Sequence, residues 1–119
     1  MAAAQRPLLV TLLGWLLILG GSAQFILHAS RIRLPLHFWD VFIPLFELIL
    51  LAAGVFLLRG SNWARWLAAA WIGFHIGVGF LNSVSQGLIH SLIFGVFVWL
   101  LFRPEVNAWF RMRRDAVRA

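Results

Sequence analysis

The sequence predicts an all-α integral membrane protein: an antiparallel bundle of four transmembrane helices with a C-terminal amphipathic helix. Four apolar runs fill most of the 119 residues, each near the about 20 that a helix needs to cross about 30 Å of hydrocarbon. Hydrophobic residues make up 62% of the chain and charged residues 12%. A water-soluble chain of this length has too little interior to bury so much apolar surface. Lipid is therefore the expected solvent.

We expect the transmembrane domain at 1–103, with spans at about 8–28, 40–58, 63–82 and 86–103. The first span also has features of a signal peptide, because small residues that suit a cleavage site at Ala23 follow its apolar core. Its apolar stretch continues to Leu27, longer than a usual signal core, which favours a span. The turns at 59–62 and 82–86 are short, so consecutive spans should pack antiparallel. The one sizeable loop, 29–38, contains Pro35.

The basic residues are all arginine and lie mainly on one side of the predicted bundle. Arg31 and Arg33 lie on one side, and the other eight lie opposite: Arg6, Arg59, Arg65, Arg103, Arg111, Arg113, Arg114 and Arg118. This asymmetry predicts that both termini are cytoplasmic. The arginine, alanine and glycine bias suggests a GC-rich bacterial genome, so the expected location is a bacterial inner membrane. The net charge of +6 is then explained by topology and attraction to anionic headgroups, so we expect no nucleic-acid partner.

Polar residues interrupt the spans at one level. Glu47, His75 and His90 all lie about 10 to 12 Å below the outer surface at about 1.5 Å per helical residue. Because residues three, four or seven apart share a helix face, the three should converge in a buried polar layer. Three further residues extend the predicted layer: Gln24, Asn82 and Gln86.

Three functions fit such a layer. Its groups can satisfy one another and fix helix register, as in an accessory or scaffold subunit of a homo-oligomer or larger complex. Glu47 can instead exchange a proton in a small transporter or channel, tuned by the two histidines. Alternatively, His75 and His90 can ligate haem, a chlorophyll-type pigment or a metal. The first is favoured, with no cofactor, and without phosphate-loop, serine-elbow or zinc-protease motifs we expect no enzyme activity.

Small residues recur every four positions on the last two spans, which is typical of closely packed membrane helices. Gly73 and Gly77 form one stripe, and Gly87, Ser91 and Gly95 form the other. We expect both to be helix contacts.

The tail, 104–119, is basic and amphipathic. Trp109 and Phe110 cluster apart from Arg111, Arg114 and Arg118, so the helix should lie on the membrane surface. Docking on a partner subunit is the alternative.

Two segments carry a family resemblance. The turn Gly60-Ser61-Asn62-Trp63-Ala64-Arg65-Trp66 and the stretch Leu101-Phe102-Arg103-Pro104-Glu105-Val106-Asn107-Ala108-Trp109-Phe110 resemble small bacterial inner-membrane proteins with four helices and no characterised activity. The resemblance covers only layout and these two turns, and it implies no functional residue.

Overall fold

The computed structural model describes residues 5–118, so residues 1–4 and 119, the outer ends of the two predicted domains, lie outside it. The described residues form five helices and no strand: α1 Leu8–Ala29, α2 Phe38–Leu58, α3 Asn62–Asn82, α4 Val84–Leu101 and α5 Pro104–Arg118. Helices α1 to α4 are long and apolar enough to span a membrane. Their bounds differ from the expected ones by at most two residues, and α5 begins at the predicted residue.

The helix ends follow from local side-chain chemistry. Asp40 accepts a hydrogen bond from the backbone N–H of His37 at 3.0 Å, which closes a capping box at the start of α2. Ser83 accepts one from the backbone N–H of Gln86 at 3.2 Å and caps α4. Gly60 has φ +84°, a backbone conformation that favours glycine, and it allows the sharp turn from α2 into α3. The predicted turns are thus built by capping and glycine conformation.

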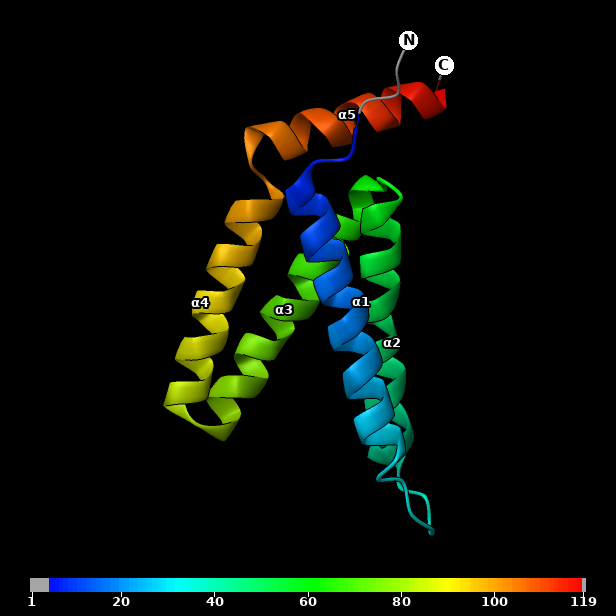
Figure 1. Ribbon diagram of the computed structural model, residues 1–119. Helices are drawn as coiled ribbons and strands as arrows, with labels where there is room; N and C mark the ends of the chain where they lie inside the picture. Colours follow the sequence, from blue (N-terminus) through cyan, green and yellow to red (C-terminus); the bar gives the residue numbers. More distant parts are fainter. Residues whose placement is uncertain (1–4, 119) are drawn as a thin grey trace.

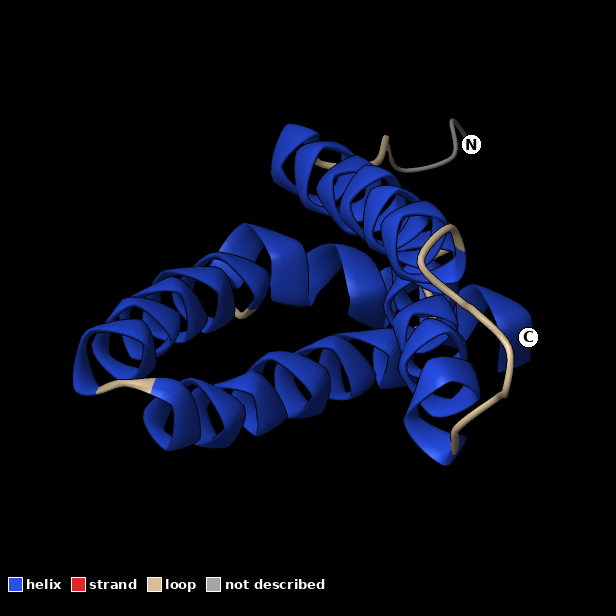
Figure 2. Ribbon diagram, turned by 90° about the horizontal axis from the view of Figure 1, so that it is seen from below, coloured by secondary structure: helices blue, strands red, loops and turns tan. Residues whose placement is uncertain are grey.

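The four long helices form two pairs. Helix α1 packs along α2 and α3 packs along α4, whereas fewer contacts join α2 to α3. Helix α5 lies across one end of the four, here called the α5 end (Figure 1). The opposite end, called the loop end, carries the connection between α1 and α2 and the turn at Ser83. The two pairs diverge toward the loop end (Figures 1 and 2).

The close approach of α1 and α2 depends on glycines in both. A Cβ on Gly54 would lie 2.7 Å from the carbonyl oxygen of Gly14, and one on Gly21 would lie 2.8 Å from the backbone nitrogen of Leu51. Backbone atoms cannot yield without moving a whole helix. Glycine therefore sets the spacing of this pair.

The predicted stripes on α3 and α4 contribute only partly to this packing. Gly87 is covered by the ring of Phe80, and Gly73 is in ordinary contact with Phe94. The expectation is wrong for Gly77 and Gly95 within this chain, because nothing lies within 4 Å of a Cβ built at either. The remaining member of the stripes, Ser91, donates its hydroxyl to the carbonyl of Gly87 on its own helix at 2.8 Å. Gly79, which lies outside both predicted stripes, is also at the contact between α3 and α4, because a Cβ built on it would lie 3.1 Å from backbone atoms of Gln86 and Gly87.

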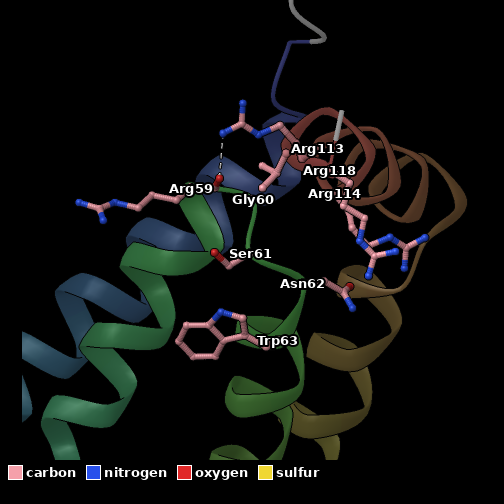
Figure 3. A pocket seen from close by; sticks show the side chains of 9 residues that line it. Arg59, Gly60, Ser61, Asn62, Trp63, Arg113, Arg114 and Arg118 are labelled. Carbon is pink, nitrogen blue, oxygen red and sulfur yellow. Dashed lines mark hydrogen bonds between the residues drawn. The ribbon is translucent and has the colours of Figure 1, made fainter.

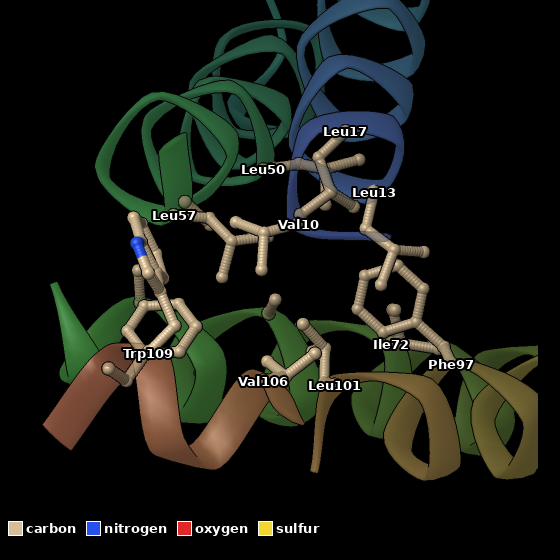
Figure 4. Close-up of a cluster of buried hydrophobic side chains, with 14 residues drawn as sticks. Val10, Leu13, Leu17, Leu50, Leu57, Ile72, Phe97, Leu101, Val106 and Trp109 are labelled. Atoms are coloured by element: carbon tan, nitrogen blue, oxygen red, sulfur yellow. The ribbon is translucent and has the colours of Figure 1, made fainter. Parts of the chain in front are cut away.

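Helix α5 is fixed to the bundle by polar contacts as well as apolar ones. Arg113 donates a hydrogen bond from Nη2 to the carbonyl of Arg59 at 3.0 Å, across the turn between α2 and α3 (Figure 3). Below this contact lies a core of apolar side chains from all five helices (Figure 4). Its buried members are Val10, Leu13, Leu17, Leu50, Ala53, Leu57, Ala64, Ala68, Ile72, Phe97, Leu101, Val106, Trp109 and Phe110.

The buried face of α5 corrects the prediction for the tail. Trp109 is 4% exposed and Phe110 is 1% exposed, both within the bundle's own core. They are therefore not available to a membrane surface or a partner subunit, because their apolar surface is already covered. Arg111, Arg114 and Arg118 are exposed, as an interfacial helix requires.

Candidate functional site

The most deeply buried acidic side chain of the described residues lies between α1 and α2. Glu47, on α2, is 5% exposed, and its Oε1 lies 3.9 Å from Nδ1 of His28 on α1. Within residues 5–118, neither that Nδ1 nor the other carboxylate oxygen, Oε2, has a hydrogen-bond partner. Buried polar groups are normally hydrogen-bonded, so the pair has unused capacity for a proton, a water molecule or a ligand.

Aromatic contacts bring the third group, His75 on α3, toward Glu47. The imidazole of His75 stacks on Trp71 with ring centroids 3.8 Å apart, and its Nδ1 lies 3.0 Å from the Trp71 carbonyl. Trp71 donates its indole N–H to the carbonyl of Phe46, next to Glu47, at 3.2 Å. One tryptophan therefore positions α3 against α2 at the level of the carboxylate.

The fourth group is His90 on α4. Its ring centroid lies 6.4 Å from that of His75, and its Nδ1 lies 2.7 Å from the carbonyl of Gln86. Only a protonated ring nitrogen can donate to a carbonyl. Nδ1 is therefore the protonated nitrogen in neutral His75 and His90, which leaves Nε2 of each ring as an acceptor or ligand.

Helices α1 to α4 thus contribute one titratable residue each to a layer made of His28, Glu47, His75 and His90, hereafter the polar layer. Three further residues of the predicted layer, Gln24, Asn82 and Gln86, have exposed side chains, so the structure does not bring them into it. Gln24 lies on an exposed side of α1, and Asn82 and Gln86 lie at the turn between α3 and α4.

The sequence predicts a further polar edge on the first span, formed by Gly21, Gln24 and His28, and of its polar side chains the structure brings only His28 to Glu47. His28 lies seven residues after Gly21, hence on the same face of α1. Gly21 packs on Leu51, which is four residues from Glu47 along α2. The glycine contact therefore sets the register that brings His28 opposite Glu47.

Within residues 5–118, no group of three or more histidine, cysteine, aspartate or glutamate side chains could hold a metal ion.

A second buried polar group, Arg65 on α3, lies at the α5 end and was expected to be only a topological charge. It is 7% exposed. Its guanidinium donates to the carbonyl of Leu101 at 3.1 Å and to the side-chain oxygens of Asn62 and Asn107. The same group lies 4.7 Å from the ring centroid of Phe102 and 4.5 Å from that of Phe110. It therefore joins α3, α4 and α5 at one point.

Four long apolar helices around a partly buried polar layer are the features of a multi-pass helical membrane protein. No family model matches this chain, and neither the curated proteins nor the solved structures provide a significant match.

Proposed function

We propose that this chain is a non-enzymatic accessory or scaffold subunit of a bacterial inner-membrane assembly. In the proposed placement the four helices cross the bilayer antiparallel, with both termini and α5 on the cytoplasmic side. The observation that carries the proposal is the lack of packing at Gly77 and Gly95. A Cβ built at either of these helical glycines would meet nothing within 4 Å. Exposed glycines lower helix stability and permit close approach of another helix.

The surroundings of these glycines support a partner. Only 17% of the apolar stretch of α4 is buried inside the chain, against 28 to 33% for α1, α2 and α3. An open groove between α1 and α4 is lined by apolar side chains alone: Leu13, Leu16, Leu92, Ile93, Val96, Phe97 and Leu100. His75 and His90 are only partly buried, and partly exposed imidazoles in hydrocarbon favour a neighbour that completes their surroundings. Helix α4 therefore offers the surface that a second subunit would cover.

The double replacement Gly77→Leu and Gly95→Leu tests this proposal. Because neither position has a neighbour in the chain, the fold should be retained, whereas a helix packed there from a second copy would be pushed away. We expect the dissociation constant of the oligomer, measured by analytical ultracentrifugation in mild detergent, to rise at least tenfold.

Gly20→Leu is the matched control, since Gly20 is equally bare but lies on α1. It should leave the oligomer intact. The proposal would be refuted if the double variant formed the same oligomer as the wild type. It would also be refuted if the wild-type protein were a monomer that binds no other subunit in its native membrane.

A second candidate, proton-coupled transport, is favoured by one observation. The Oε2 of Glu47 is buried without a hydrogen-bond partner among the described residues, as is Nδ1 of His28. Ionisable residues inside membranes commonly mark proton pathways. His28, Glu47, His75 and His90 would then form the relay.

Replacing Glu47 with glutamine separates the two candidates. For a scaffold we expect the unfolding free energy to fall by about 1 kcal/mol, because the contact with His28 is weakened, with no change in proton flux across liposomes. Asp40→Asn is the control, since Asp40 caps α2 outside the layer. A wild-type proton flux that Glu47→Gln abolishes and Asp40→Asn preserves would favour transport over the scaffold.

The absorption spectrum of the purified protein tests ligation by His75 and His90. A scaffold should show no absorption band between about 350 and 800 nm, the range in which tetrapyrroles absorb strongly. A Soret or chlorophyll-type band that His90→Ala removes would replace the scaffold proposal by a pigment-binding one.

A further inference from the structure

The α5 end carries an open pocket whose charged side chains are all arginines. It has a volume of about 310 Å³ and lies where the turn between α2 and α3 meets α5. Its walls are formed by Arg59, Gly60, Ser61, Asn62, Trp63, Arg113, Arg114, Val117 and Arg118. A smaller polar pocket beside it shares Asn62 and Arg114 and adds Arg111. The chain thus concentrates positive charge over two adjoining hollows.

The arginines of the larger pocket have different roles. The side chain of Arg59 points away from α5, and Arg113 is held by its hydrogen bond to the Arg59 carbonyl (Figure 3). The side chains of Arg114 and Arg118 extend together on the other side of α5, toward Asn62 (Figure 3). Arg113 therefore positions the helix, and the guanidinium groups of Arg114 and Arg118 are the ones free to bind.

The positive charge of this pair is only weakly compensated. Nε of Arg114 lies 3.8 Å from Asp115, but both side chains are more than half exposed, and such surface pairs contribute little. Two neighbouring guanidinium groups favour an anion between them, and their planar donors match phosphate oxygens.

The N-terminus of α3 adds to the positive electrostatic potential of this pocket. Ser61 precedes α3, but its side chain forms no hydrogen bond to the backbone N–H groups of the first turn. The positive end of a 21-residue helix therefore faces the pocket without a side-chain cap. Asn62, the first residue of α3, lines both pockets.

The position of the pocket indicates the source of the anion. It lies where two apolar helices end, and Trp63, 50% exposed, forms part of its wall. Tryptophan prefers the interface of a bilayer, and arginines just outside it attract anionic headgroups. From this geometry we infer that Arg114, Arg118 and Asn62 form a binding site for the phosphate of an anionic phospholipid headgroup. The acyl chains of that lipid lie along Trp63 and the apolar surface below it.

The test measures the thermal midpoint of the full-length protein in nonionic detergent. Added phosphatidylglycerol should raise the midpoint, because a ligand that binds the folded state stabilises it, whereas phosphatidylcholine should not. The double variant Arg114→Gln and Arg118→Gln should lose at least tenfold in apparent affinity for phosphatidylglycerol. Both residues are exposed, so its midpoint without lipid should match the wild type.

The control is Arg31→Gln with Arg33→Gln, which changes the net charge equally at the loop end and should retain the shift. Native mass spectrometry of bound phosphatidylglycerol provides a second measurement that does not depend on stability. Equal shifts with phosphatidylcholine, retained affinity in the Arg114 and Arg118 variant, or an equal shift produced by inorganic phosphate alone would overturn the inference.

Discussion

Replacing Arg65 with methionine is expected to detach α5 from the bundle. The side chain joins α3 to the Leu101 carbonyl and to Asn107 through its guanidinium, which also packs between Phe102 and Phe110. Methionine keeps the apolar volume but leaves buried acceptors without a donor. Hydrogen bonds to charged groups contribute about 1.5 to 3 kcal/mol each, so we expect a loss of about 3 kcal/mol or more in unfolding free energy. Denaturation in mixed micelles and limited proteolysis of α5 would measure it.

Arg118→Met is the control for this change. It makes the same substitution on an exposed residue of α5 and should leave the unfolding free energy within about 0.5 kcal/mol of the wild type. The unfolding free energy of Arg65→Lys should lie between those of Arg65→Met and Arg118→Met, because an ammonium group keeps the charge but lacks the planar guanidinium. Wild-type protection of α5 in the Arg65→Met protein would contradict the role assigned to this residue.

Replacing Gly54 with alanine should separate α1 from α2. The added methyl would lie 2.7 Å from the Gly14 carbonyl oxygen and 3.0 Å from the backbone nitrogen of Ile18, so only a movement of the whole helix can relieve the clash. Overpacking of this kind costs about 1 to 3 kcal/mol. It should also move His28 away from Glu47, which lies seven residues before Gly54 on the same face of α2.

The same substitution at Gly20 should raise the free energy of unfolding, whereas at Gly54 it should lower it. A Cβ there meets nothing within 4 Å, so alanine should stabilise the helix by about 0.5 to 1 kcal/mol through its better helix propensity. Reversible unfolding of both variants in one detergent gives the comparison. Equal effects of the two substitutions would show that α1 and α2 are not held at glycine contact.

The positions of the helices could be predicted from the sequence, because each helix depends on a local property of the chain. A run of apolar residues near the length of a bilayer crossing, interrupted by Gly60 or Ser83, predicts where a helix begins and ends without knowledge of its neighbours. The candidate site was only partly accessible. Depth along a helix identified Glu47, His75 and His90, since rise per residue is constant. It gave no means to reject Gln24, whose side chain faces outward, or Asn82, which lies exposed at the turn between α3 and α4.

The sequence by itself thus determined four apolar helices of membrane-spanning length, an amphipathic fifth and the level of the polar residues, because these follow from hydrophobicity and helical periodicity. Only the tertiary structure decided which faces meet. Side-chain packing between helices selected Gly54 and Gly79 as contacts over Gly77 and Gly95 and brought His28 to Glu47. It also buried Arg65 beneath α5 instead of leaving it as a surface charge. Contact depends on the rotation of each helix against its neighbour, and that rotation is set by the shapes of both surfaces together.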